Sequence, residues 1–268
     1  MKKVNLFLLV LVIFMASCGT TRTVPVTGRK QNLVVSDEQM LSLSTQQYNE
    51  YMKKAKKSTN TANTAMVQRV GKKLATAVET YLKQNGLVNE LSGYKWEFNL
   101  VKDNSVNAFC MPGGKIVVYE GLLPVTKNET ALAIVLGHEI AHAVAKHSAE
   151  QLSKQYKQQV GMQIGSAVLS AAGMGANTSS LLEWATSKGL QLRNLKYSRD
   201  HENEADHMGL IFAAMAGYNP NEAVTFWQRM AAASGGSSSD FLSDHPSDAK
   251  RIENIKGWLP EALKYYKK

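Results

Sequence analysis

The alternation of hydrophobic and polar residues predicts a chain made mainly of amphipathic helices. Apolar residues recur at steps of three and four positions, which places them on one face of a helix. Residues 160–176 are rich in Gly, Ala, Ser and Met, and a core helix, a lid and a membrane contact all remain open for them. The spacing elsewhere predicts helices over residues 36–57, 66–87, 126–152, 181–197, 201–216, 221–233, 247–259 and 260–268.

A region in the middle of the chain has the pattern of strands instead. Residues 96–101 alternate between apolar and polar, and residues 107–111 and 115–119 flank the turn signal Pro112-Gly113-Gly114. This arrangement predicts one strand followed by a hairpin. The sequence therefore indicates an α+β fold, mostly α, in which a small sheet immediately precedes the helix over residues 126–152.

Length and charge set the next limits. The chain has 268 residues, which is enough for one large domain or two small ones. The net charge of +9 could favour anionic membrane surfaces or nucleic acid. However, Lys and Arg are scattered, and no basic block is interleaved with aromatic residues, so we expect no nucleic-acid partner.

The first residues have the features of an export signal. Two lysines precede ten nearly uninterrupted apolar residues, too few to span a bilayer. Met15-Ala16-Ser17-Cys18 resembles the lipobox of bacterial lipoproteins, although Met stands where Leu is usual. The resemblance implies a signal peptide over residues 1–17 and a lipid anchor on Cys18, which holds the protein to a membrane. The alternative is an ordinary signal peptide with an incidental cysteine.

The helix over residues 126–152 contains the motif His138-Glu139-Ile140-Ala141-His142. Thr126 and Glu129 have the spacing of a capping box at its start. Positions four apart lie on the same helix face, so both imidazoles can bind one zinc ion. Glu139 then lies beside the metal and can take a proton from a water molecule.

A catalytic zinc site needs a third protein ligand and an open fourth position. One class of zinc peptidase places a Gly and a third His further along the motif helix, but here those positions are Ala145 and Ser148. That class is excluded, and we expect the nearby His147 to lie at the surface.

A second class draws a Glu from a later helix. Glu202 and Asp206 are four positions apart and share a face, whereas Glu204 points elsewhere. We expect Glu202 to bind zinc and Asp206 to accept the ring N–H of a ligand histidine, His138 in our assignment. The competing interpretation is a solvated acidic helix face. We expect Arg199 to be an ion-pair partner of the acidic helix rather than a substrate clamp.

Together these motifs resemble the gluzincin metallopeptidases, a family that includes HtpX, the CAAX prenyl endopeptidase and the lipoproteins BepA and LoiP. The matching pieces are Pro25-Val26-Thr27-Gly28-Arg29, Asn107-Ala108-Phe109, Pro112-Gly113-Gly114, Gly121-Leu122-Leu123, His138-Glu139-x-x-His142, Ser198-Arg199, Glu202-x-Glu204-Ala205-Asp206, Gly209, His245-Pro246 and Arg251-Ile252.

The resemblance implies a zincin-like fold, one zinc ion at His138, His142 and Glu202, and Glu139 as general base. It also implies that the loop carrying His245 lies over the metal. Unlike BepA, the chain shows no tetratricopeptide repeats after the peptidase domain, and unlike the membrane-embedded members it has no pair of long apolar helices flanking the motif. Asp244 stands where Thr is commoner.

Three roles remain possible for His245: stabilising the oxyanion during catalysis, occupying the open metal position to hold the enzyme shut, or serving a structural purpose before Pro246.

The sequence also leaves undecided which strand would bind a substrate. An extended peptide can pair with a free sheet edge. Our candidate comprises Ile116, Val117, Val118 and Tyr119, and the alternative is that this strand is interior.

We therefore predict a signal peptide over 1–17, a lipid-anchored tether and domain entry over 18–35, and a zinc metallopeptidase domain over 36–268. Its partners would be protein or peptide substrates, plausibly misfolded or misassembled proteins of the bacterial envelope, and envelope assembly machinery. We place it at the periplasmic side of the outer membrane. The alternatives are a non-proteolytic assembly or chaperone lipoprotein with a structural or plugged zinc site, and a membrane-surface binding module.

Overall fold

A computed structural model of the chain describes residues 20–167, 179–233, 245 and 249–267. The predicted signal peptide, Cys18, the part of 160–176 beyond residue 167, and the residues flanking His245 lie outside this range. The described elements are β1 (Thr20–Thr23), β2 (Lys30–Leu33), α2 (Asp37–Lys54), α3 (Thr61–Gln84), η1 (Val88–Gly93), β3 (Glu97–Val101), β4 (Ala108–Met111), β5 (Lys115–Tyr119), η2 (Glu120–Leu122), α4 (Leu123–Thr126), α5 (Glu129–Val144), α6 (His147–Ala167), α7 (Ser179–Ser187), η3 (Leu192–Asn194), α8 (Arg199–Met215), α9 (Glu222–Ala233) and α11 (Ala249–Tyr265).

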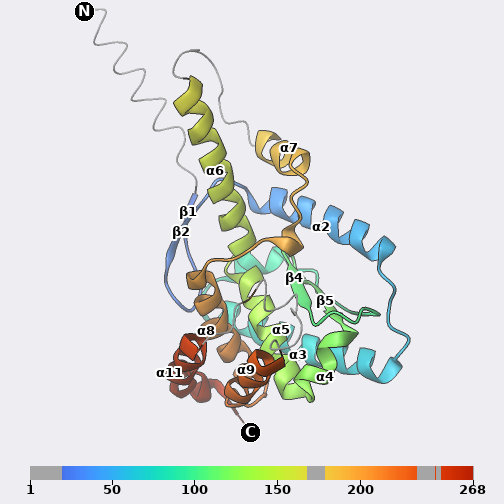
Figure 1. Cartoon of the computed structure of the whole chain (residues 1–268). Helices are drawn as coiled ribbons and strands as arrows, with labels where there is room; N and C mark the ends of the chain where they lie inside the picture. The colour runs from blue at the N-terminus through green and yellow to red at the C-terminus, as the bar shows by residue number, and fades with distance from the viewer. Residues whose placement is uncertain (1–19, 168–178, 234–244, 246–248, 268) are drawn as a thin grey trace, which may run out of the picture.

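Helices α5 and α8 form the centre of the fold (Figure 1). Every residue from Ala131 to Val144 of α5 is buried, because its mostly apolar sequence can be covered on all sides. Helices α3, α8 and α9 and strand β4 pack around it. The predicted α+β, mostly helical fold is thus confirmed.

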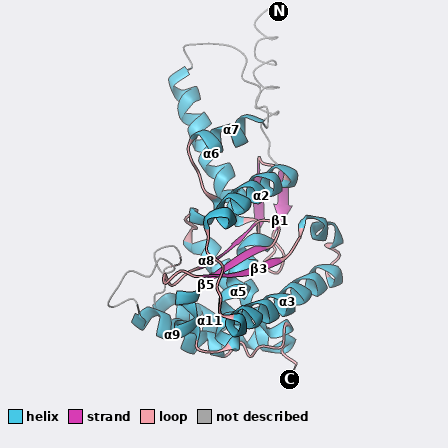
Figure 2. Ribbon diagram, turned by 90° about the vertical axis from the view of Figure 1, so that its right-hand side faces the viewer, coloured by secondary structure: helices cyan, strands magenta, loops and turns pink. Residues whose placement is uncertain are grey.

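The three-stranded sheet has the order β3-β5-β4 and lies between two layers of helix (Figure 2). Strand β5 pairs with β3 in parallel and with β4 antiparallel. Ile116 and Val118 pack into the main core with α3 and α5, while Val117 and Tyr119 pack with Tyr48 of α2. A central strand covered on both faces needs apolar residues at every position, which explains the run Ile-Val-Val-Tyr.

The hairpin of β4 and β5 and the strand β3 were predicted, but the position of β5 in the sheet was not. Our candidate substrate strand, Ile116, Val117, Val118 and Tyr119, is the central strand and has no free edge, so that prediction is wrong. The cause is β3, which pairs along the side of β5 opposite β4. The alternation of apolar and polar residues predicts which segments form strands, but it does not predict the order of the strands in the sheet.

The start and end of the motif helix also differ from expectation. Asn128, not Thr126, caps α5, and its side chain accepts a hydrogen bond from the Ala131 amide. The helix stops at Val144 instead of continuing to residue 152, because Lys146 adopts a left-handed φ of 55°. Helix α6 then begins at His147 in a new direction.

The predicted tether contains ordered structure. Strands β1 and β2 form an antiparallel hairpin, and β2 packs against α6. The turn between them has positive φ at Val26 and Gly28. Residues 20–33 therefore belong to the folded unit.

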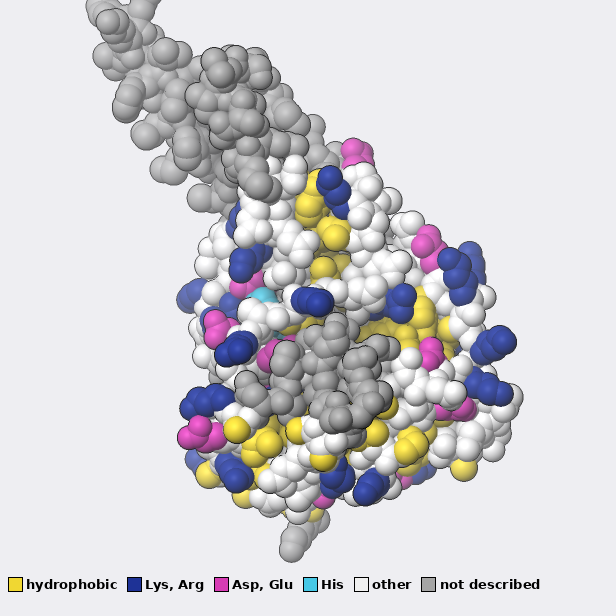
Figure 3. All heavy atoms as spheres, in the orientation of Figure 1, with side chains coloured by type: hydrophobic (Ala, Val, Ile, Leu, Met, Phe, Trp, Pro, Cys, Tyr) yellow, Lys and Arg dark blue, Asp and Glu magenta, His cyan; other side chains and the backbone are white. Residues whose placement is uncertain are grey.

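Two helices near the C-terminus differ from their predicted lengths. The helix predicted over 181–197 is limited to α7, followed by the short η3. The two helices predicted over 247–268 form the single helix α11, which contains Pro260. Within the described residues, no helix combines the length and apolar character needed to cross a bilayer. On the face shown in Figure 3, Lys and Arg side chains are dispersed, with Asp and Glu between them.

Candidate metal centre

Helix α5 presents two imidazoles to the same point. His138 and His142 are one helical turn apart, both are buried, and their Nε2 atoms lie 3.0 Å from each other. The spacing of four residues therefore directs both imidazoles to one place, as the motif predicts. Burial lowers the pKa of His142 well below its usual value, so its ring is the neutral form that can bind a metal.

Helix α8 brings a carboxylate to the same point. Ser198 caps the helix, and Glu202 lies in its first turn. Its Oε2 lies 3.4 Å from His138 Nε2, and its Oε1 lies 3.4 Å from His142 Nε2. Burial alone would raise the pKa of Glu202, but the neighbouring histidines outweigh this and hold it well below the usual value. The carboxylate is therefore ionised.

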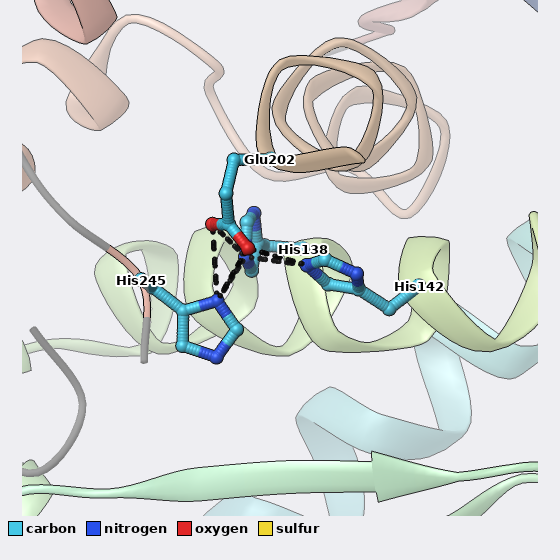
Figure 4. A group of neighbouring side chains, drawn as sticks. All are labelled: His138, His142, Glu202 and His245. Carbon is cyan, nitrogen blue, oxygen red and sulfur yellow. Dashed lines mark hydrogen bonds and ion pairs between the residues drawn. The ribbon is translucent and has the colours of Figure 1, made fainter. Parts of the chain in front are cut away.

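A fourth donor comes from the far end of the chain. His245 is buried, and its Nδ1 lies 3.1 Å from His138 Nε2 and 3.0 Å from both oxygens of Glu202. Figure 4 shows the four side chains converging from α5, α8 and the segment that carries His245. Each offers one ligand atom, and all four atoms lie within 4.8 Å of one another.

This donor set fits zinc. Nitrogen from imidazole and oxygen from carboxylate are the ligands that zinc takes in catalytic sites. His138 Nδ1 lies 2.9 Å from the Asp206 carboxylate, so Nε2 is the ring nitrogen of His138 that faces the other donors. Four possible ligand atoms thus converge in a buried space, an arrangement that a bound cation would stabilise.

Glu139 lies next to the donors without being one of them. Its side chain is buried, and its Oε1 is 3.5 Å from His245 Nε2. Within the described part of the chain, this oxygen has no hydrogen-bond partner. Burial raises the pKa of Glu139. A buried, unsatisfied oxygen beside the donor set is suited to bind a water molecule and to take its proton.

Asp206 holds His138 in place, as its spacing from Glu202 predicts. Its Oδ1 lies 2.9 Å from His138 Nδ1. Sequence reasoning did not assign a role to Arg251, which donates to both Asp206 oxygens at 2.7 and 2.8 Å. Arg251 also donates to the backbone oxygen of His245 at 3.1 Å, and its guanidinium lies 3.4 Å from the centre of the Trp227 ring. Arg251 therefore connects Asp206 to the segment of the fourth donor.

Arg199 does not have the contacts that we predicted. It lies exposed at the first position of α8, and across the described ranges it forms no ion pair with an acidic residue. Arg29 and Arg251, from other parts of the chain, pair with Glu204 and Asp206 of this helix instead.

His147 was placed wrongly by sequence reasoning, because it is fully buried rather than at the surface. Glu204 is 6% exposed, so the competing interpretation of a solvated acidic face does not hold for it. His147 Nδ1 lies 2.8 Å from His142 Nδ1, and His147 Nε2 lies 2.9 Å from Glu204 Oε2. Glu204 does point away from the four donors, as expected from its position two residues after Glu202.

Cys110 is buried in β4, where burial raises the pKa of its thiol. A thiol held in its protonated form is a poor nucleophile.

Strand β4 lies at an edge of the sheet and packs against α5. Among the described residues, Ala108–Met111 is therefore the edge strand next to the motif helix, and all four of its residues are buried.

Comparison with known proteins gives a family and several relatives. Residues 61–259 match the family described as "Peptidase family M48". The mitochondrial metalloendopeptidase OMA1 of Schizosaccharomyces pombe is 37% identical over 187 residues, covering 69% of this chain and 53% of that protein. Human metalloendopeptidase OMA1 is 31% identical over 245 residues, covering 90% of this chain and 46% of that protein. Metalloprotease LoiP of Escherichia coli is 29% identical over 190 residues, covering 68% of this chain and 72% of that protein. The chain thus spans about half the length of the two OMA1 proteins.

Proposed function

The chain belongs to peptidase family M48, and from this premise we propose that it is a zinc-dependent endopeptidase that hydrolyses peptide bonds of protein substrates. The observation that carries the proposal is the convergence of His138, His142 and Glu202 beside the unsatisfied oxygen of Glu139. Three donors with an adjacent carboxylate form the set that metal-assisted hydrolysis requires.

In this proposal His138, His142 and Glu202 hold one zinc ion. When bound, zinc supplies a Lewis acid that activates water and polarises the scissile carbonyl. Asp206 and Arg251 keep the His138 ring oriented so that its Nε2 faces the other donors. The site is assembled from α5 and α8, which pack against each other at the centre of the fold.

Glu139 is the general base. Its Oε1 accepts a proton from the attacking water, and the carboxyl group then gives that proton to the leaving amine. The raised pKa of Glu139 suits both steps, because a carboxylate with a pKa nearer neutrality holds a proton long enough to deliver it. An extended substrate that adds a strand to the sheet would do so at β4, since β5 is paired on both sides.

The contacts of His245 support the second of its three possible roles. Its Nδ1 lies among the ligand atoms, at 3.1 Å from His138 Nε2 and 3.0 Å from the Glu202 oxygens. An oxyanion-stabilising group would instead face the space occupied by the substrate. We therefore propose that His245 takes the fourth position in a resting state and leaves it when substrate binds.

The same contact also favours one rival function, a non-proteolytic assembly or chaperone lipoprotein with a plugged zinc site. One experiment separates the two. The wild-type protein and Glu139→Gln are incubated with casein, with and without a chelator, and their zinc content is measured. We expect digestion by the wild type only, loss of digestion in chelator, and equal zinc content. Undiminished digestion by Glu139→Gln would refute the mechanism, and zinc-bound wild type without digestion would favour the rival.

We propose, further, that the protein acts at the bacterial cell envelope, held by lipid at Cys18 to the outer membrane. The sequence Met15-Ala16-Ser17-Cys18 after a charged start and an apolar run supports this location. The S. pombe and human relatives are described as mitochondrial, so a mitochondrial location is the competing one. Mass spectrometry of the mature N-terminus decides: a diacylglyceryl group on Cys18 is expected, and a free Cys18 or a cut elsewhere refutes the anchor.

A further inference from the structure

A buried chain of hydrogen bonds leads away from the ligand His142. Its Nδ1, the ring nitrogen that does not face the other donors, lies 2.8 Å from Nδ1 of His147. The other nitrogen of His147 lies 2.9 Å from Glu204 Oε2. Both histidines are buried, and the mechanism proposed above gives no role to His147.

We propose that His147 is a positioning residue for the metal centre, which selects the tautomer of His142 whose Nε2 lone pair is free for zinc. This inference rests on the proposed zinc site and deepens it. A histidine that binds a metal usually donates its second N–H directly to a carboxylate or a carbonyl. Here a second imidazole stands between the ligand and the carboxylate.

The direction of the hydrogen bonds follows from the chemistry of the rings. Glu204 can only accept, so His147 Nε2 carries a proton and donates it to the carboxylate. A neutral His147 then has a lone pair on Nδ1, which can only accept. His142 Nδ1 must therefore carry a proton, and its Nε2 is left with the lone pair that a metal needs.

The far end of the chain is fixed from several sides. Arg29 donates to Glu204 Oε2 from Nε at 3.0 Å and from Nη2 at 2.8 Å. The hydroxyl of Thr27 donates to Glu204 Oε1. Both residues belong to the turn between β1 and β2, and Arg29 is itself paired with Glu150 of α6. The carboxylate is thus held as an ionised acceptor in a defined place.

The break between α5 and α6 makes this contact possible. On one continuous helix, positions five apart point to different faces, so His147 could not reach His142. Lys146, with a left-handed φ of 55°, separates the two helices, and the His147 ring lies within hydrogen-bond distance of His142. The ring of His147 also stacks on His201 at a centroid distance of 4.3 Å, which fixes its plane.

The test measures zinc affinity in the full-length protein by competition with a chromogenic chelator. His147→Phe keeps a ring of similar size that can stack on His201, but it removes both nitrogens. We expect it to weaken zinc binding by about 10–100-fold. His147→Asn keeps an oxygen near the position of Nδ1 that can accept from His142, and we expect it to recover most of that affinity.

His207→Phe is the matched control. His207 also lies on a helix, with Nε2 2.7 Å from Glu261 Oε2 and its ring stacked on Trp258, but none of its contacts reaches a ligand. We expect wild-type zinc affinity for this variant. Melting temperatures of the chelated proteins accompany every measurement. Should His147→Phe lower only the melting temperature and bind zinc like wild type, His147 is structural and the proposal is overturned.

A second measurement uses the wild type alone and covers the case in which His147→Phe does not fold. Long-range ¹H–¹⁵N spectra of the zinc-loaded protein report which ring nitrogen of each histidine carries a proton. We expect a proton on Nε2 of His147 and on Nδ1 of His142. A proton on Nδ1 of His147 overturns the proposal. If wild type binds no zinc at all, it is the proposed function that fails.

Discussion

Gly137 of α5 and Gly209 of α8 touch backbone to backbone. A Cβ added to Gly209 would lie 2.7 Å from the amide nitrogen of His138, and one added to Gly137 would lie 2.8 Å from the carbonyl oxygen of Gly209. Side-chain carbon atoms do not approach backbone atoms this closely. The contact therefore sets the separation of the two helices at the level of the first ligand, His138, and so the distance from His138 to Glu202.

The first prediction follows from this contact. Gly209→Ala forces α5 and α8 apart, which we expect to destabilise the fold by about 1–3 kcal/mol as overpacking does. Zinc affinity should fall as well, because His138 and Glu202 no longer converge. Thermal melting and zinc competition measure the two effects. Gly257→Ala in α11 is the control, since a Cβ there meets nothing within 4 Å. Wild-type zinc affinity in Gly209→Ala would show that the helix separation does not control the site.

The second prediction concerns the partner of His138. Asp206→Asn keeps the shape of the side chain but removes the charge that faces Arg251 and the His138 N–H. We expect zinc affinity to fall by about 10–100-fold, as is usual when the outer partner of a metal-binding histidine is changed. The measurement is zinc competition at neutral pH.

Asp200→Asn provides the comparison for this substitution, because Asp200 lies exposed in the first turn of the same helix. It makes the same chemical change on α8 without touching His138. Equal zinc affinities for the two variants would mean that Asp206 does not orient the ligand.

Part of this site could be predicted because its spacing is local. His138 and His142 lie one turn apart on one helix, and so do Glu202 and Asp206, so each pair is visible in the sequence. The fold class and the central hairpin were likewise predicted from short-range periodicity. The convergence of the two pairs is tertiary, and it was expected only by comparison with known classes of zinc peptidase. The burial of Glu139 was not predicted.

The residues that were missed act across long distances in the chain. Arg251 meets Asp206 from another helix, and Arg29 meets Glu204 from the N-terminal hairpin, and neither has a spacing that marks its partner. His147 was misplaced because a left-handed Lys146 is not marked by its side chain, whereas a glycine would have been.

The third prediction is a pH dependence of stability. Burial alone would raise the pKa of Glu150, but hydrogen bonds from Arg29 and His201 outweigh this and lower it to about 2. An unfolded Glu titrates at about 4.3, so the folded state binds the proton less well than the unfolded state. The stabilisation by Glu150 is therefore complete above about pH 4.5 and is lost as the pH falls toward 2.

Glu150→Gln tests this dependence. In chelator, which removes the effect of the metal, the variant should melt below wild type at pH 6, and the difference should shrink as the pH falls below about 4.5. Glu253→Gln controls for net charge, because the Glu253 side chain is 72% exposed. A difference that stays constant from pH 6 to pH 3 would contradict the assigned ion pair.

The last prediction decides among the roles of His245. In the resting state proposed above, its Nδ1 occupies a position that substrate must take, so His245→Ala should raise the rate of casein digestion at saturating zinc. Zinc binding should weaken, because one of the four donors is lost. The two effects have opposite directions, which no general loss of folding can produce. An oxyanion-stabilising role predicts instead a rate reduced by about 10²–10³-fold with zinc still bound. A structural role predicts an unchanged rate per folded molecule.

His207→Ala is the control, because His207 is hydrogen-bonded to Glu261 and lies away from the donors. This variant should change neither the digestion rate nor the zinc affinity. A lower digestion rate in His245→Ala at full zinc occupancy would therefore rule out the plug.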